Sequence, residues 1–179
     1  STLREEGYST VLIANEAINL IKNKDQSRPL FLYVAFNAPH TPIEAPLQDI
    51  EKFSYVEDEK DRVYAANVNA LDNEIGRIIK TIEAEGLLEE TIILFFSDNG
   101  PLFDMSPIFK VMAPDLVDAK GSTAGLSGSK GSAMEGGIRV PAVMWWKGII
   151  ENEKSEQFFF VQDVLPTLLT AANIKTSEA

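Results

Sequence analysis

Two apolar runs along the chain lack the alternation of apolar and polar residues that a half-exposed strand shows. They are residues 30–36, LFLYVAF, and residues 91–96, TIILFF. β-Branched and aromatic residues dominate both runs, so we predict a buried strand over each, as in the middle of an α/β sheet. Residues 140–146, VPAVMWW, predict a third strand, and residues 158–161 predict a short fourth one.

Other segments carry apolar residues at the three- and four-residue spacing of an amphipathic helix. Residues 9–24 predict one helix, and residues 61–85 predict the longest one. Gly86 stands where the glycine that ends a helix belongs, and a last helix is expected around residues 165–172. Helix followed by strand, twice over, predicts an α/β fold with a mostly parallel or mixed sheet flanked by helices.

Two stretches show neither periodicity. Residues 43–58 are acidic and contain Pro46, which indicates a solvated loop. Residues 101–129 are rich in proline and glycine, and a loop of this length is typical of a functional or mobile segment. No internal repeat and no linker composition divides the 179 residues, so we expect one domain that is long enough to bury a real core.

Composition narrows the classes of partner. The formal net charge of −11 argues against nucleic acid and against anionic membrane surfaces. The sequence contains no cysteine, which excludes disulfides and thiolate metal sites. No apolar run approaches the length of a membrane span, so we predict neither a nucleic-acid nor a membrane partner.

Polar residues that could carry chemistry follow the predicted strands. Asp98 and Asn99 come directly after the second apolar run, and His40, the only histidine, lies just past the first. In open α/β sheets ligands gather at the carboxyl ends of strands, and carboxylate and amide oxygens suit Ca²⁺ or Mg²⁺. An Asp-Asn-Gly turn, a surface histidine and a solvated Lys130 in a glycine- and serine-rich loop explain the same residues without any ligand.

A series of segments in this order has the pattern of a known family. The segments are RPLFLYVAFNAPHTPIEAP, YAANVNALDNEIGRIIKTIEAEGL, TIILFFSDNG, KGSAMEGGIRVPAVMWW and FVQDVLPTLLTAANI, and the match as a whole runs from about residue 8 to residue 174. They resemble the sulfatases of the alkaline-phosphatase-like superfamily, nearest in pattern to the arylsulfatase B type. The resemblance implies a partial alkaline-phosphatase-like sandwich. It also implies hydrolysis of sulfate esters of a sulfated small molecule or glycan, either a carbohydrate or an aryl alcohol.

The resemblance implies a role for each candidate residue. Asp98 and Asn99 would be two ligands of a Ca²⁺ ion, with Mg²⁺ as the other candidate, which polarises the sulfate oxygens. His40 would contact the ester near its leaving oxygen as a hydrogen-bond donor or general acid. Lys130 would neutralise sulfate oxygens, and Arg139 would bind substrate close by.

The chain also departs from the family pattern. It has no cysteine, and no serine in the short motif from which the family makes its formylglycine nucleophile. No Asp-Asp pair supplies the further metal ligands. We therefore expect residues 1–179 to be a partial sulfatase catalytic domain, its C-terminal part, with the nucleophile outside this chain. Residues 101–129 have no clear counterpart, so the resemblance leaves the choice of sulfate ester open.

Alternatives to a sulfatase stay open at this point. The chain alone fits a catalytically silent structural or binding fragment, because the nucleophile is absent. A phosphatase or phosphodiesterase of the same superfamily is the other alternative, although such enzymes commonly use more histidine ligands than the single one here. Without its N-terminal partner region, an open sheet edge predicts self-association or marginal stability. The resemblance alone implies a periplasmic, secreted or lysosomal location.

Overall fold

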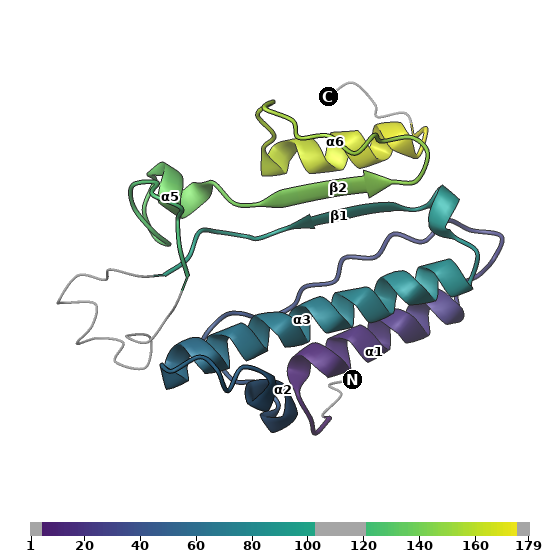
Figure 1. The fold of residues 1–179 in the computed structure, drawn as a ribbon. Helices are drawn as coiled ribbons and strands as arrows, with labels where there is room; N and C mark the ends of the chain where they lie inside the picture. Colours follow the sequence, from purple (N-terminus) through teal and green to yellow (C-terminus); the bar gives the residue numbers. More distant parts are fainter. Residues whose placement is uncertain (1–4, 103–120, 175–179) are drawn as a thin grey trace. The chain divides into compact units, whose positions relative to one another are not determined.

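The structure is a computed structural model that describes residues 5–102 and 121–174. The chain divides into two units, residues 1–149 and residues 150–179, and each is described by itself. The first unit contains α1 (Ser9–Lys22), α2 (Leu47–Lys52), α3 (Glu59–Ala84), η1 (Leu88–Glu90), β1 (Ile92–Phe96), α5 (Glu135–Ile138) and β2 (Ala142–Trp146) (Figure 1). The second unit contains α6 (Val161–Ala171). None of the helices in the described ranges is long and apolar enough to cross a membrane.

The helices α1 and α3 confirm the two long helices that the apolar spacing predicts. They pack against each other and lie side by side in Figure 1. Each buries small apolar side chains, namely Ala14 and Ala17 on α1 and Ala66 and Ala70 on α3. Small side chains allow two helix axes to approach closely, so this pair forms the most buried part of the first unit.

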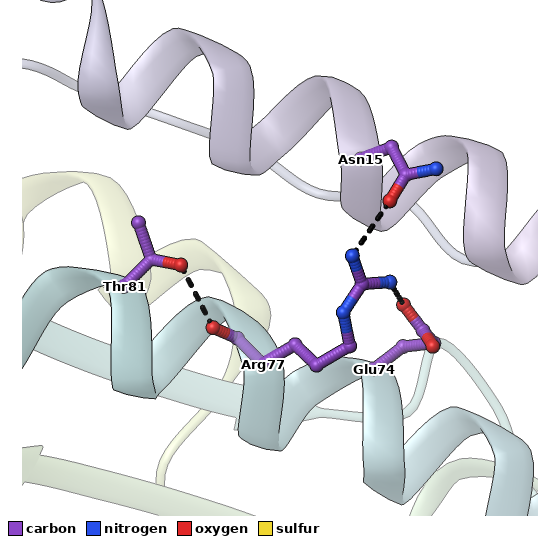
Figure 2. A network of polar contacts seen from close by, with 4 residues as sticks. All are labelled: Asn15, Glu74, Arg77 and Thr81. Atoms are coloured by element: carbon purple, nitrogen blue, oxygen red, sulfur yellow. Dashed lines mark hydrogen bonds and ion pairs between the residues drawn. The ribbon is translucent and has the colours of Figure 1, made fainter.

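A polar network adds to the contact between α1 and α3 (Figure 2). Glu74 on α3 is only 8% exposed, and its carboxylate forms an ion pair with Arg77 one turn further along. The Nη2 atom of Arg77 also donates to Asn15 Oδ1 on α1 at 2.8 Å. Arg77 therefore pairs the buried carboxylate and joins the two helices at once.

The end of α3 follows from Gly86, as its position in the sequence predicts. Gly86 adopts a φ of +71°, the left-handed conformation that ends many helices. Its amide donates to Glu83 O at 2.9 Å, and the amide of Leu87 donates to Ile82 O at 3.0 Å. These two bonds satisfy the last carbonyl groups of the helix and direct the chain into η1 and β1.

The strands β1 and β2 confirm the predicted strands at residues 91–96 and 140–146. They pair in antiparallel orientation, with Ile92 opposite Trp146 and Phe96 opposite Ala142. The α/β class is confirmed, and this pair fits a mixed sheet rather than a purely parallel one. The indole Nε1 of Trp146 donates to Glu89 O at 3.1 Å, which ties β2 to η1.

The predicted strand at residues 30–36 is wrong for this chain, because the structure assigns no strand there. Exposure still alternates along the segment with the two-residue period of a strand, and Phe31 and Tyr33 are each 75% exposed. A strand exists only when a neighbour supplies ladder hydrogen bonds, and no described segment pairs with this one. The apolar pattern was real, but its partner is missing from the described residues.

The solvated loop predicted at residues 43–58 is wrong in part, because it contains α2. This short helix packs against α3 and buries Asp49, whose carboxylate accepts a hydrogen bond from Lys52 Nζ at 2.6 Å. Pro46 stands at its N-cap, and the acidic first turn and basic last turn suit the helix dipole. A six-residue helix is too short for its apolar period to be visible in the sequence.

The short strand predicted at residues 158–161 is also wrong. The structure places no strand there, and Val161 already begins α6. The carboxylate of Asp163 accepts a hydrogen bond from the amide of Phe160 at 2.8 Å and so fixes the start of the helix. The helix α6 confirms the predicted last helix, although it begins earlier than the apolar spacing predicts.

Arg77→Met tests the network between α1 and α3. The substitution leaves the buried Glu74 carboxylate without its ion-pair partner, so we expect the free energy of unfolding to fall by about 1–3 kcal/mol. The matched control is Lys80→Met, an exposed cation of the same helix. Urea unfolding of the full-length protein measures both, and an equal loss in the two variants would contradict a specific role for Arg77.

Candidate functional site

The turn after β1 presents two side-chain oxygens that could bind a metal ion. Ser97 Oγ donates to Asn99 O at 3.0 Å, and Asn99 Nδ2 donates to Gly100 O at 2.9 Å. This second bond uses the amide nitrogen of Asn99 and leaves its Oδ1 as an acceptor. The Asp98 carboxylate is exposed and forms neither a hydrogen bond nor an ion pair with the described parts of the chain. The turn therefore offers a carboxylate and an amide oxygen to a ligand.

The antiparallel pairing of β1 and β2 brings the lysine-bearing loop to this turn. The amide of Lys130 donates to Pro101 O at 2.8 Å, and the amide of Gly100 donates to Gly137 O at 2.9 Å. Because β2 runs back along β1, the residues before β2 lie next to the residues after β1. The expectation from strand ends concerned His40 and Asp98, whereas the Lys130 loop reaches the Asp98–Asn99 turn through antiparallel pairing.

His40 lies in the turn that follows residues 30–36. Its amide donates to Asn37 O at 2.8 Å, and its ring Nδ1 lies 2.7 Å from Thr41 O. A carbonyl oxygen only accepts, so Nδ1 carries the proton of this bond and Nε2 remains for a ligand. The side chain is exposed, as a residue that contacts a substrate requires.

The loop that carries His40 is held to the helices through one carbonyl group. The oxygen of Glu44 accepts hydrogen bonds from Asn67 Nδ2 on α3 at 2.6 Å and from the Tyr8 hydroxyl at 3.1 Å. Asn67 is only 3% exposed. The sequence reasoning missed Asn67, although an amide side chain next to the apolar stripe of an amphipathic helix was the available signal.

Arg139 is the least engaged of the candidates. Its Nη1 lies 3.3 Å from Glu135 Oε2, four residues earlier, and both side chains are 63% exposed. An exposed ion pair of this kind contributes little stability, so the guanidinium is free to exchange Glu135 for an anionic ligand at small cost.

All five candidate residues line one cavity of the first unit. The cavity has a volume of about 1490 Å³, and its lining includes His40, Asp98, Asn99, Lys130 and Arg139. Apolar side chains of α3 share the lining, namely Val68, Leu71, Ile75, Ile78 and Ile82. Burial raises the pKa of Tyr64, which also lines the cavity, above its ordinary value of 10.0. The space exceeds the roughly 300–1,000 Å³ of a usual ligand pocket, so it is more than a substrate site.

The metal-binding capacity of these residues is partial. No group of three or more His, Cys, Asp or Glu side chains could hold a metal ion within the ranges 5–102 and 121–174. Asp98 and Asn99 fit a hard cation by their oxygen chemistry, but Ca²⁺ takes about 6–8 oxygen ligands. The chain therefore supplies part of such a site and not the whole.

Comparison with known proteins shows the family to which the chain belongs. Residues 2–174 match the family profile described as Sulfatase, so the chain belongs to the sulfatase family. The uncharacterized sulfatase YdeN of Escherichia coli K12 is 33% identical over 172 residues, which cover 94% of this chain and 28% of that protein. Arylsulfatase J of mouse is 30% identical, with coverage of 96% and 26%. Mouse N-acetylgalactosamine-6-sulfatase is 28% identical, with coverage of 95% and 30%.

Solved structures agree with this assignment. The chain resembles Ps i-CgsB, crystallised in complex with k-i-k-neocarrahexaose, with a TM-score of 0.82 and 29% identity. The match covers 99% of this chain and 37% of that one. The PsFucS1 sulfatase from Pseudoalteromonas sp. has a TM-score of 0.71 at 23% identity, a likeness that concerns the fold alone. The chain thus spans between about a quarter and two fifths of the relatives it matches.

Asn67→Ala tests the anchor of the His40 loop. Without the bond to Glu44 O, we expect the His40 amide to exchange its hydrogen about fivefold faster, the equivalent of roughly 1 kcal/mol. Hydrogen exchange followed by mass spectrometry over residues 37–46 measures this, with the exposed Asn73→Ala on the same helix as control. Unchanged exchange in Asn67→Ala would show that other contacts hold the loop.

Proposed function

We propose that the protein containing this chain hydrolyses sulfate esters, with a sulfated carbohydrate or an aryl sulfate as substrate. Membership of the sulfatase family supports the reaction, and the carbohydrate complex of Ps i-CgsB supports the substrate class. The observation that carries the proposal is the junction of two segments. The Asp98–Asn99 turn and the Lys130 loop are hydrogen-bonded to each other and line one cavity with His40.

Each residue has a distinct task in this proposal. The oxygens of Asp98 and Asn99 would hold a Ca²⁺ ion, with Mg²⁺ as the other candidate, and the chemistry supplied there would be Lewis-acid polarisation of the sulfate oxygens. The Lys130 ammonium neutralises the remaining oxygens, and Arg139 contributes a second cation at the rim. His40 donates a hydrogen bond through Nε2, when protonated, to the oxygen that leaves with the alcohol.

The nucleophile of the proposed reaction is a formylglycine that lies outside this chain. The sequence holds no cysteine and no serine in the required context, and the chain spans 28% of its relative YdeN. The isolated chain is therefore proposed to be catalytically silent. The sulfated substrate is proposed for the whole protein and not for this chain alone. The same holds for its proposed location in the periplasm, the extracellular space or the lysosome.

The rest of the same catalytic domain is the proposed partner of the cavity. Its lining joins the apolar stripe of α3 to the unpaired segment at residues 30–36. Further elements of the domain would cover the apolar residues and supply the ladder bonds of a strand.

The first test of the function uses the full-length protein, with formylglycine verified by mass spectrometry, and a chromogenic aryl sulfate. We expect Asp98→Ala and Lys130→Met each to lower turnover by at least about 10²-fold, since each removes transition-state charge stabilisation. Asp98→Ala should also raise the Ca²⁺ concentration for half-maximal activity. Glu83→Ala, an exposed carboxylate on α3, serves as control. A formylglycine-bearing wild type without turnover of sulfate esters would refute the proposal.

A second test addresses the uncovered surface. Expressed alone, the 19.7 kDa chain should self-associate through the apolar lining, and Tyr33→Lys should shift it toward the monomer. Tyr33 is 75% exposed and lines the cavity, whereas the control residue Tyr55 is 76% exposed and does not. Light scattering after size exclusion measures the mass. A wild-type monomer that melts cooperatively would contradict the expectation.

A further inference from the structure

Three glycines lie where the turn after β1 meets the lysine loop. Gly100, Gly136 and Gly137 are all buried. None of them has a positive φ, so conformational freedom does not explain their use. A Cβ atom on any of them would stand less than 3.0 Å from a backbone atom of another segment, a distance that real Cβ atoms essentially never show. The reason for glycine is therefore the closeness of backbone to backbone.

The contacts form a continuous chain across the site. A Cβ on Gly100 would overlap the carbonyl of Gly136, and a Cβ on Gly136 would lie 2.8 Å from Ser127 O. The amide of Gly136 donates to the same Ser127 oxygen at 2.8 Å. A Cβ on Gly137 would lie 2.5 Å from Ser129 O, the residue before the lysine. At these three glycines the strand-end turn, α5 and the lysine loop thus approach each other backbone to backbone.

Two further hydrogen bonds fix how far apart the two functional segments lie. The amide of Gly100 donates to Gly137 O, and the amide of Lys130 itself donates to Pro101 O. Backbone contacts have no side-chain rotamers that could absorb a displacement, so an added methyl group must push one segment away from the other. Displacements near 1 Å in an active site can cost about 10²-fold in rate.

We propose that Gly100, Gly136 and Gly137 are positioning residues that set the separation between the Asp98–Asn99 metal ligands and Lys130. This inference rests on the proposed sulfatase function and deepens it. The glycines touch neither substrate nor metal; they act through the backbone of the residues that do. Mere packing is the competing explanation, and it predicts a loss of stability without a change in metal dependence.

Gly136→Ala and Gly137→Ala in the full-length protein test the proposal, with Gly76→Ala as control. Gly76 lies in α3, and a Cβ there would meet no atom within 4 Å. We expect both test variants to lower kcat for an aryl sulfate by about 10²-fold per folded molecule, with KM changed less. The Ca²⁺ concentration for half-maximal activity should rise at least about fivefold, because the ligand turn moves. The control should stay within about twofold in each quantity.

A second kind of variant keeps the proposal testable if the Gly→Ala variants fail to fold, because it adds no atoms to the junction. Pro101→Gly gives freedom to the residue whose carbonyl accepts the Lys130 amide bond, and it should lower kcat per folded molecule in the same direction, with a stability loss of only about 1 kcal/mol from the freer unfolded chain. Wild-type kcat and Ca²⁺ dependence per folded molecule in Gly136→Ala and Gly137→Ala would overturn the inference.

The failure of the proposed function has a different signature. If the formylglycine-bearing wild type turns over no sulfate ester, Ca²⁺ binding by calorimetry still tests the junction. A weaker Ca²⁺ affinity in Gly136→Ala than in Gly76→Ala then supports the positioning role. Equal affinities, or no Ca²⁺ binding by the wild type, overturn it.

Discussion

The antiparallel pairing of β1 and β2 is the constraint on which the candidate site depends. With Phe96 opposite Ala142, the segment that leaves β1 and the segment that enters β2 are forced to the same end of the pair. The hydrogen bond from the Gly100 amide to Gly137 O continues that pairing beyond the strands, and the Lys130 amide donates to Pro101 O next to it. A slip of one residue would turn every side chain of β2 to the opposite face and separate the two segments.

In the first unit the contact between α1 and α3 is well packed, whereas other apolar side chains line the large cavity. Alanines and a paired Glu74 close the contact between α1 and α3, whereas the isoleucine stripe of α3 lines the large cavity. An apolar helix face is stable only when something covers it. The chain spans only part of the length of its sulfatase relatives, 28% of YdeN, and we propose that further elements of the domain cover the side chains that line the cavity.

The residues of the candidate site are separate in the sequence and come together only in part in the structure. Asp98, Asn99, Lys130 and His40 occur in the sequence as isolated polar residues, and each has an ordinary reading as a turn, a solvated cation or a surface histidine. The hydrogen bonds that join the Lys130 loop to the segment after Asp98 and Asn99 support the functional reading for these two segments. We propose their roles as metal ligands, anion-binding cation and hydrogen-bond donor. The proposed metal site needs further ligands, because Asp98 and Asn99 supply fewer than the about 6–8 oxygens that Ca²⁺ takes.

Several structural features of this protein could be predicted from its sequence because they depend on interactions between residues that are close together in the chain. The apolar period of α1 and α3, the end of α3 at Gly86, the runs at β1 and β2 and the family motifs depend on residues close together in the chain. Three outcomes depended on distant residues instead. The run at residues 30–36 needs a ladder partner to become a strand, and α2 needs α3 to bury its Asp49 side.

The third outcome is the junction of Gly100, Gly136 and Gly137. In a sequence, glycine most often indicates a tight turn or a backbone conformation that other residues disfavour. Only the tertiary structure gives the other reason, because a backbone-to-backbone contact joins residues more than thirty positions apart and leaves no periodic trace in either segment. Sequence determined which residues could act, and strand pairing with backbone packing decided which of them meet.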